Sequence, residues 1–264
     1  VALEGETIAA CVTEIGYLHR GFEKACEHHT YSQVIPYTDR LNYCSAILNN
    51  IGWAKAIEDM MKIEITPRAK MIRVVIGELS RIIDHFVCNA ANMVDLGGLT
   101  SLWYLFGARD QAYDLLSKLT GARLTNTYTR IGGLEFDLYD GFEKDLEEVL
   151  KTSEKAIEDV LSLIAHNKLF HDRTQDVGVI KADFALANGI SGPNLRAAGV
   201  AHDLRKDRPY YGYENFDFDL VIGSHGDVYD RMMCRFEESI QSIKIIRQAM
   251  KNIPDGAINV YAPN

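Results

Sequence analysis

A long amphipathic pattern runs from Thr66 to Val94. Thr66 followed by Pro67 is typical of a helix start, because the threonine can cap the first turn and proline is well suited to the first helical position. Apolar residues then recur at helical spacing, namely Ile72, Val75, Ile76, Leu79, Ile82, Ile83, Phe86 and Val87. Such a helix would be about 40 Å long. Its apolar stripe is broad, so we expect it at the centre of a bundle.

Polar residues interrupt this pattern in its second half. Glu78 and Arg81 are three residues apart and Arg81 and His85 are four apart, so all three share one face of the helix, with Asp84 beside them. The simplest interpretation is a satisfied polar rim in which His85 is structural. Asp95 then closes the helix before a glycine pair, where the helix dipole disfavours an acid. From the residues alone, Asp95 is read as part of a turn.

The rest of the chain also favours helices. We expect one from Tyr43 to about Lys62, with Glu58 and Asp59 pointing outward, and others over residues 109–119, 141–170 and 226–252. Strands are expected within Val1–Thr13 and at Phe216–Ile222, and the aromatic segment Ser101–Phe106 is expected in the core. The predicted fold class is therefore mainly α: a helical bundle around a long central helix, with small β elements, in a single domain over residues 1–264.

Composition excludes several function classes. The formal net charge of −9 argues against a nucleic-acid partner. Five cysteines are present, but none form a C-x-x-C pair, which argues against a zinc ribbon, a self-contained iron–sulfur cluster and a hydrogenase-type metal site. No apolar run is long enough to span a bilayer, so we expect membrane association only through partners.

The stretch Y-T-D-R-L-N-Y-C-S-A-I-L-N-N, residues 37–50, gathers an acid, a guanidinium and two phenols at the mouth of a helix. Polar groups in such a place cost desolvation free energy unless something pairs with them. We therefore predict that this stretch forms the lip of a cavity and that Arg40 and Tyr43 point towards its chemistry.

Several motifs resemble one known family. These are T-D-R-L-N-Y, the A-I-E-D helix after it, T-P-R-A-K-M-I-R at residues 66–73, and G-P-N-L-R-A-A-G-V-A-H-D-L-R-K-D-R-P-Y-Y-G-Y at residues 192–213. They resemble the D subunit of NADH-quinone oxidoreductase, the quinone-binding peripheral-arm subunit of respiratory complex I. The resemblance covers essentially the whole chain. More distantly, the chain is similar to the large subunit of nickel–iron hydrogenases, whose fold we expect here.

The resemblance implies an enzymatic role as one subunit of a proton-translocating NADH:quinone oxidoreductase. Electrons would pass from an iron–sulfur cluster in a partner subunit to quinone, the substrate, and this chain would bind no metal or cluster itself. Tyr43 would hydrogen-bond to the quinone carbonyl and donate a proton. Asp95, at the position of the family's D-x-G-A-L-T aspartate, would help to deliver protons to reduced quinone.

Further residues acquire roles from the same resemblance. Arg20 and Arg40 would lie near the partner's iron–sulfur cluster, and Thr125 would lie there too, at a position where the family usually has a histidine. Four charged residues of the 192–213 motif would form an interface and cavity wall: Arg196, Asp203, Arg205 and Lys206. We also expect an exposed apolar and arginine-rich patch near Arg20, Arg40 and Arg205.

The implied partners are the cluster-bearing B subunit of complex I, its C subunit and the membrane-arm subunit that lines the quinone entrance. The implied location is peripheral, on the cytoplasmic side of the inner membrane. The family also has an H-P-x-T-H-G loop before this region, with a quinone-ligating histidine, and a further C-terminal segment. Neither occurs in the chain, so we expect a piece of the D subunit truncated at both ends.

Alternatives remain open. One is a hydrogenase-type large subunit, but its R-x-C-G-x-C motif would place cysteines where Asn42 and Ser45 stand. Another is a non-catalytic scaffold or assembly relative. A third is the equivalent subunit of a complex that accepts electrons from ferredoxin or reduced deazaflavin.

Thr125 generates a testable prediction. Threonine does not titrate near neutrality as histidine does, so the midpoint potential of the neighbouring cluster should depend less steeply on pH than in relatives that keep the histidine. Redox titration of the cluster at several pH values, in the assembled complex, measures this slope. A slope as steep as in those relatives would contradict the assignment.

Overall fold

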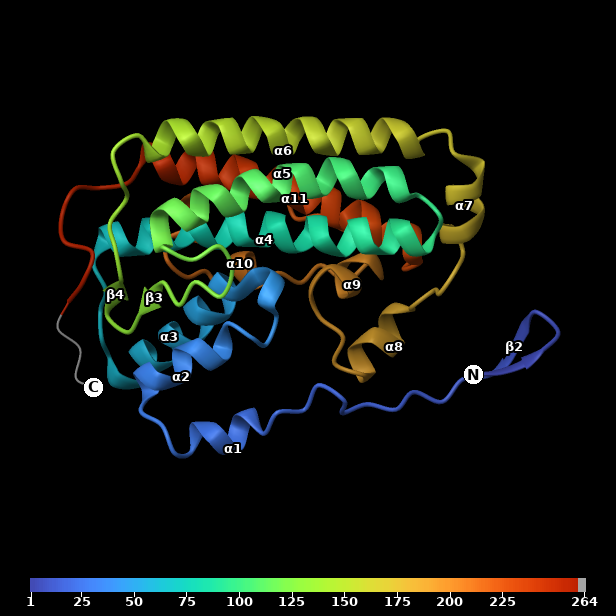
Figure 1. Cartoon of the computed structure of the whole chain (residues 1–264), viewed down its shortest axis with the longest axis horizontal. Helices are drawn as coiled ribbons and strands as arrows, with labels where there is room; N and C mark the ends of the chain where they lie inside the picture. Colours follow the sequence, from blue (N-terminus) through green and yellow to red (C-terminus); the bar gives the residue numbers. More distant parts are fainter. Residues whose placement is uncertain (261–264) are drawn as a thin grey trace.

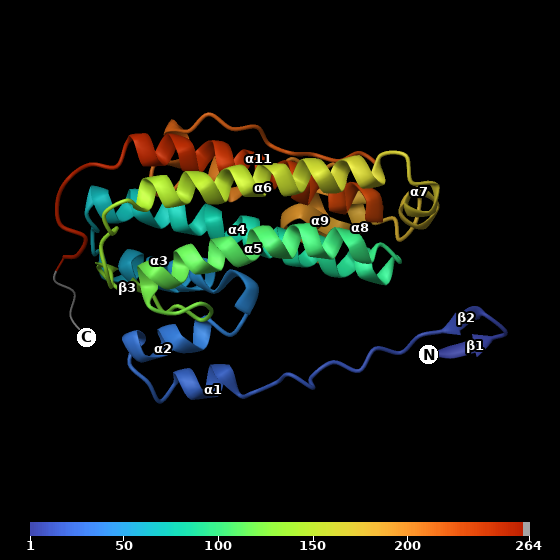
Figure 2. The same cartoon turned by 45° about the horizontal axis from the view of Figure 1, so that its top comes forward.

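The computed structural model describes residues 1–260, and four long helices form its main body. These are α4 (Pro67–Asp95), α5 (Leu99–Thr120), α6 (Phe142–Ile164) and α11 (Val228–Lys251). They lie side by side in both views (Figures 1 and 2), and each packs against two others in the order α4, α5, α6, α11 and back to α4. The predicted mainly α fold with small β elements is confirmed.

Helix α4 is the central helix, as the sequence pattern predicts. The Thr66 side chain accepts a hydrogen bond from the backbone N–H of Ala69 at 3.1 Å, and Pro67 opens the helix. At the other end, Gly97 adopts a left-handed conformation with φ of 91°, and the N–H of Gly98 donates to the carbonyl of Met93 at 2.7 Å. Between these ends, α4 buries its apolar residues against α3, α5 and α11.

Helices α4 and α11 run antiparallel. Asn89 near the end of α4 donates to the carbonyl of Met232 near the start of α11 at 3.1 Å, and Arg68 at the start of α4 donates to the carbonyl of Pro254 beyond the end of α11. Asp227 caps α11 by accepting from the backbone N–H of Asp230 at 2.8 Å. The C-terminal end of α4 therefore lies beside the N-terminal end of α11.

The remaining elements are short and surround the bundle. The helical ones are α1 (Phe22–Cys26), α2 (Tyr31–Thr38), η1 (Tyr43–Ser45), α3 (Ala46–Met61), α7 (Lys168–Thr174), α8 (Ala182–Ala187), α9 (Gly192–Ala197), α10 (Leu204–Asp207) and η2 (Tyr213–Asn215). Two antiparallel hairpins complete the fold, β1 (Ala2–Glu4) with β2 (Thr7–Ala10) and β3 (Thr129–Arg130) with β4 (Gly133–Leu134). The first hairpin and residues 11–21 form an exposed arm that extends away from the bundle (Figures 1 and 2). No helix within residues 1–260 is long and apolar enough to cross a membrane.

The predicted strand at Phe216–Ile222 is wrong. Phe216 and Phe218 are buried in alternation, as in a strand, but no other strand lies beside this segment within residues 1–260. Side chains of α11 take the place of the partner strand, because Gln248 and Gln241 accept from the backbone N–H groups of Asp217 and Asp219 at 2.8 and 3.0 Å. The alternation therefore indicates that one face of this segment is buried, although the segment pairs with no strand within residues 1–260.

Two helix boundaries also differ from the prediction. Helix α5 begins at Leu99 and includes the aromatic segment expected in the core, yet Trp103 is 68% exposed and Tyr104 is 43% exposed. The helix expected over residues 141–170 ends at Ile164, and Asn167 caps a separate helix, α7, by accepting from the N–H of Phe170. An asparagine that binds the backbone in this way favours a new helix start over continuation.

Glu58 was expected to point outward from α3, but it is 3% exposed. Its carboxylate accepts two hydrogen bonds of 2.7 Å from Arg73 of α4, whose side chain is also buried. Arg73 donates further to the carbonyls of Arg130 and Gly133 around the β3–β4 turn. A bidentate pair of this kind compensates for burying both charges, and it joins α3, α4 and the hairpin.

Glu78 of α4 forms the second buried ionic cluster. Its side chain is fully buried and accepts from Arg205 at 3.0 Å, from Ser242 of α11 at 2.6 Å and from Tyr213 of η2 at 2.5 Å. Arg81 donates to it as well, at 3.1 Å. Burial alone would raise the pKa of Glu78, but the charges of Arg81 and Arg205 and the hydrogen bonds from Ser242 and Tyr213 hold it well below its usual range.

We predict that Glu78→Gln lowers the free energy of unfolding by about 3–5 kcal/mol at pH 7, because it leaves buried arginines without their counter-charge. Urea unfolding of the purified chain measures the change. As a matched control, Glu147→Gln removes one carboxylate from the partly exposed ion pair with Arg247 and should cost less than about 1 kcal/mol.

The stability contributed by Glu78 should also depend on pH. Because the pKa of Glu78 is lowered by folding, its contribution to stability is present above the unfolded value of about 4.3 and is lost as the pH falls below it. The difference in the free energy of unfolding between the wild-type chain and Glu78→Gln should therefore become smaller as the pH is lowered. A difference that stays constant down to about pH 3 would contradict the assigned charge of the cluster.

Candidate functional site

The turn between α2 and η1 is held by one buried acid. Asp39 is 0% exposed, and its carboxylate accepts from the hydroxyl of Thr127 at 2.5 Å and from the backbone N–H of the same residue at 3.4 Å. With Asp39 turned inward, its neighbour Arg40 points outward and donates to the carbonyl of Pro36. Tyr43 begins η1 and is 58% exposed. The structure therefore places Arg40 and Tyr43 at the surface, but only Arg40 lines one of the two pockets described below, so the role of Tyr43 at the lip of a cavity stays a prediction.

A polar cluster fastens this turn to the central helix. Asn42 donates to the hydroxyl of Ser45 at 2.7 Å and to the carboxylate of Asp84 on α4 at 3.0 Å. Asn42 and Ser45 stand at the positions where the hydrogenase motif would have cysteines, and here they bind each other. Among residues 1–260, no three His, Cys, Asp or Glu side chains lie close enough together to hold a metal ion.

The pKa of the Cys44 thiol, next to Tyr43 in the sequence, shows which charges act on this turn. Burial raises the pKa of Cys44 above its ordinary value, and the negative charge of Asp84 raises it further. The positive charge of Arg109 on α5 acts in the opposite direction. The Arg109 guanidinium lies 4.2 Å from the ring centroid of Phe106 and 4.9 Å from that of Tyr113. An acid and a stacked arginine therefore act on the residue next to Tyr43.

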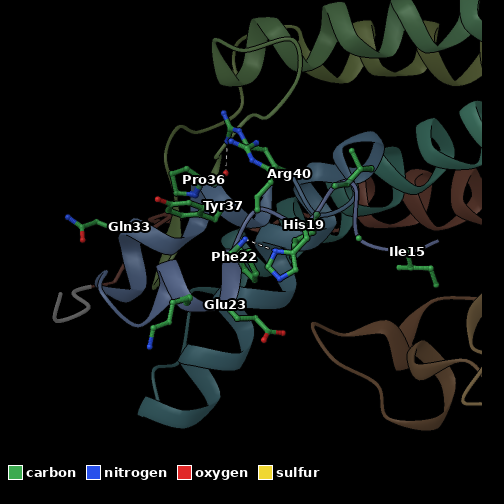
Figure 3. Close-up of a pocket in the computed structure, with 14 residues that line it drawn as sticks. Ile15, His19, Phe22, Glu23, Gln33, Pro36, Tyr37 and Arg40 are labelled. Atoms are coloured by element: carbon green, nitrogen blue, oxygen red, sulfur yellow. Dashed lines mark hydrogen bonds between the residues drawn. The ribbon is translucent and has the colours of Figure 1, made fainter.

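Arg20 and Arg40 line the same depression, which has a volume of about 990 Å³. Figure 3 shows its two sides, with Ile15, His19 and Phe22 from the N-terminal arm and α1 facing Pro36, Tyr37 and Arg40. The arm contributes exposed apolar side chains here, including Leu18. The structure thus brings together the two arginines that the resemblance assigns to one neighbourhood.

Asp95 lies elsewhere. It is the last residue of α4 and lines a separate pocket of about 340 Å³ with Arg231 and Arg235 of α11. Asp84, which contacts the Tyr43 turn through Asn42, precedes Asp95 by eleven residues, so the two are about 16 Å apart along the helix. Asp95 lines the 340 Å³ pocket only, and Tyr43 lines neither this pocket nor the one that contains Arg20 and Arg40.

Thr125 lies in the loop between α5 and β3. Its backbone is left-handed, with φ of 53°, and its hydroxyl donates to the carbonyl of Leu124. Thr127, two residues further on, is the partner of Asp39. The loop with Thr125 therefore contacts the turn that carries Arg40, although Thr125 does not line the depression with Arg20.

Of the four residues in the 192–213 segment that are predicted to form an interface and cavity wall, three are turned into the protein. Arg196 binds Glu238 of α11 at 2.6 Å, and Arg205 binds both Asp203 and Glu78. The expectation that Arg205 belongs to an exposed patch is therefore wrong, because it is 4% exposed and its charge is used inside the fold. Lys206 alone of the four is exposed, with its amine 3.9 Å from the ring centroid of Phe218. A role of this segment as an interface or cavity wall remains a prediction.

Two groups that border the candidate sites were not predicted from the sequence. The sequence predicts Arg109 only as the start of a helix, and Arg231 and Arg235 only as part of the last helix. The spacing of Arg231 and Arg235 was available as a signal, because residues four apart on a helix share a face. Asp84 was recognised as polar, but its long-range contact with Asn42 could not be read from local spacing.

Comparisons with known proteins agree with one another. Residues 95–264 match the family model described as the 49 kDa subunit of respiratory-chain NADH dehydrogenase. The C/D subunit of NADH-quinone oxidoreductase from Bdellovibrio bacteriovorus is 50% identical over 254 residues, which are 96% of this chain and 45% of that protein. The D subunit from Pelobacter propionicus is 46% identical over 98% of this chain and 64% of its own length, and that from Leptospira biflexa is 45% identical over 100% and 65%. The chain thus spans about half to two thirds of the length of these relatives.

The charges around Cys44 give a testable prediction about the Tyr43 turn. Asp84→Asn should lower the pKa of the Cys44 thiol and speed its alkylation at pH 8, whereas Arg109→Gln should raise the pKa and slow it. Mass spectrometry of iodoacetamide-treated protein measures the rate at Cys44, with the exposed Cys11 as internal reference. Equal rates in both variants would show that neither charge reaches the thiol.

Proposed function

The chain belongs to the family of the 49 kDa subunit of respiratory-chain NADH dehydrogenase, and on this basis we propose that it forms the quinone-binding part of an NADH-quinone oxidoreductase subunit. The proposed reaction passes two electrons from NADH, by way of an iron–sulfur cluster in a partner subunit, to a quinone that also takes up two protons. The names of the relatives support NADH as the donor and quinone as the acceptor for those proteins. In this proposal the reduction is coupled to proton translocation by the whole complex.

Tyr43 carries the proposed chemistry at the quinone. A phenol can donate a hydrogen bond to a quinone carbonyl and stabilise the negative charge that grows there as electrons arrive. It can then pass its proton to the same oxygen. The single observation that supports this role is the orientation of the turn: Asp39 is locked inward by Thr127, and Tyr43 is left outward and 58% exposed beside Arg40.

Asp95 is proposed as the second proton-handling group. It is an exposed carboxylate at the end of α4, and a carboxylate can take up or release a proton as the quinone is reduced. In the described residues it lies apart from Tyr43, so it would act on the charge balance of the site rather than on the same quinone oxygen.

Arg20 and Arg40 are proposed to face the partner subunit that carries the cluster. Both line the 990 Å³ depression, whose apolar walls come from the N-terminal arm and α2. An exposed surface that combines apolar side chains with permanent positive charge suits a protein partner with a reducible, negatively charged centre. Thr125, in the loop that binds the same turn, is proposed to lie near that centre.

The other assignments follow from family membership and are proposals too. The B and C subunits of the complex and the membrane-arm subunit at the quinone entrance are the proposed partners, and they would hold the protein at the cytoplasmic side of the inner membrane. The chain is proposed to be a single domain, which the large cluster of buried apolar residues that spans α3–α6 and α11 supports.

We predict that Tyr43→Phe, in the full-length protein within its assembled complex, lowers quinone reduction by about 100-fold, because it removes the phenolic proton donor and leaves the ring. Reduction of an artificial acceptor that takes electrons upstream of quinone should be unchanged. Tyr31→Phe, at another exposed tyrosine of the same region, is the matched control and should leave both rates unchanged.

A Tyr43→Phe complex that reduces quinone at the wild-type rate would remove Tyr43 from the mechanism. Loss of both activities together would instead mean that the turn supports assembly, and the quinone site would then have to be sought around Asp95.

A further inference from the structure

The pocket of about 340 Å³ that contains Asp95 also contains two arginines that no part of the proposed function uses. It lies where the C-terminal end of α4, the N-terminal end of α11 and α9 meet. Asn92 and Asp95 come from α4, Arg231 and Arg235 from α11, and Asn194 from α9. The pocket thus holds one acid and two bases on facing elements.

Both guanidinium groups bind only neutral partners among residues 1–260. Arg231 donates to the carbonyls of Gly226 and Gly178 at 2.6 and 3.0 Å. Arg235 donates to the carbonyl of Arg231 at 2.8 Å and to the side-chain oxygen of Asn194 at 3.0 Å. These bonds fix the two side chains at the pocket wall but leave their charges without a directly bound carboxylate in the described part of the chain.

The nearby acids Asp227 and Asp230 act on Arg231 through their charge, but neither forms an ion pair with Arg231 or Arg235 in the described residues. Asp227 accepts from the backbone N–H groups of Asp230 and Asp176, and Asp230 accepts from those of Ser224 and His225. Burial is the main reason that the pKa of Arg231 is lowered, and although Asp227 acts against this, the like charge of Arg235 adds to it. Further along the helices, Glu238 is already bound by Arg196 and His85.

Asp95 is a negatively charged group that has no bound positive partner in the described part of the chain. Within residues 1–260 its carboxylate makes neither an ion pair nor a hydrogen bond, although it lines the pocket. It also stands at the C-terminal end of a 29-residue helix, where the backbone dipole opposes a negative charge. The N-terminal end of α11, which faces it across the pocket, favours a negative charge.

We propose that Arg231 and Arg235 are positioning residues for Asp95, which hold its ionised carboxylate in this pocket and balance its charge during quinone reduction. The proposal rests on the proposed function of Asp95 and deepens it. A rotamer change that brings the carboxylate into the pocket would form a charge-assisted hydrogen bond with a guanidinium already fixed in place. Asp95 could then release or take up its proton without leaving an uncompensated charge at the end of α4.

The test uses the full-length protein in its assembled complex and measures kcat and KM for quinone reduction, with the upstream artificial acceptor as reference. The variants are Arg235→Gln, Arg235→Lys, Arg231→Gln, Asp95→Asn and the double variant of Asp95→Asn with Arg235→Gln. Arg247→Gln is the matched control, since it removes the same charge from the same helix at a site bound to Glu147 and Glu154 on α6. Two separate arginine variants are included so that the outcome does not depend on the assembly of one.

We expect Arg235→Gln to lower kcat for quinone reduction by about tenfold with little change in KM, and Arg235→Lys to restore it to within about threefold, since it keeps the charge. The artificial acceptor rate and the Arg247→Gln complex should match the wild type. In the Asp95→Asn background, Arg235→Gln should have no further effect, because a residue that acts through Asp95 is not additive with it.

The inference and the proposed function fail in different ways. If Asp95→Asn leaves quinone reduction unchanged, Asp95 has no role in the reaction, and both its proposed function and the inference are overturned. If Asp95→Asn lowers kcat but neither arginine variant does, or if the effects multiply in the double variant, the inference is overturned and the role of Asp95 stands. Failure of Arg235→Lys to restore the rate would mean that the arginine acts by packing, which also overturns the inference.

Discussion

The fold depends on one buried carboxylate, Glu78. A charge of this kind is tolerated only when its surroundings supply opposite charge and hydrogen bonds, and here they come from four elements: α4 itself, α10, η2 and α11. The requirement ties the irregular 192–213 segment to the bundle. That segment has little regular structure to hold it, so the ionic cluster determines where it lies. Through Arg205 and Asp203 the cluster continues to Arg196, and from there to Glu238 of α11.

Two further buried acids act in the same way around the bundle. Glu58 fixes the β3–β4 turn to α3 and α4 through Arg73, and Asp39 fixes the turn after α2 to the loop before β3. Each of these acids has its hydrogen-bond partner inside the chain. Arg20, Arg40, Tyr43 and Asp95, which have proposed roles towards quinone or a partner subunit, are among the charged and phenolic groups that are left outward. At the turn after α2, the burial of Asp39 leaves its neighbour Arg40 outward, because adjacent residues on a short turn cannot both face inward.

The sequence predicted the elements with long, regular patterns and missed those decided by contacts far along the chain. Helix α4, its Thr66–Pro67 start and its stop near Gly97 follow from local spacing and capping. Glu58 could not be placed, because its burial depends on Arg73, and a charged residue on a helix otherwise points to solvent. The Phe216–Ile222 segment has the alternation of a strand, but glutamine side chains of α11 satisfy its backbone. Of the candidate site, the grouping of Arg20 with Arg40 was foreseen through the resemblance, whereas the arginine pair facing Asp95 required the antiparallel packing of α4 and α11.

The central claim is that the turn after α2 presents Tyr43 to the quinone. The most direct measurement is a structure of the assembled complex with quinone bound, in which the distance from the Tyr43 hydroxyl to the nearest quinone carbonyl oxygen is read. We predict a hydrogen bond of about 2.6–3.2 Å. A headgroup bound elsewhere, with the Tyr43 hydroxyl covered by a partner subunit and out of reach of the quinone, would contradict the claim.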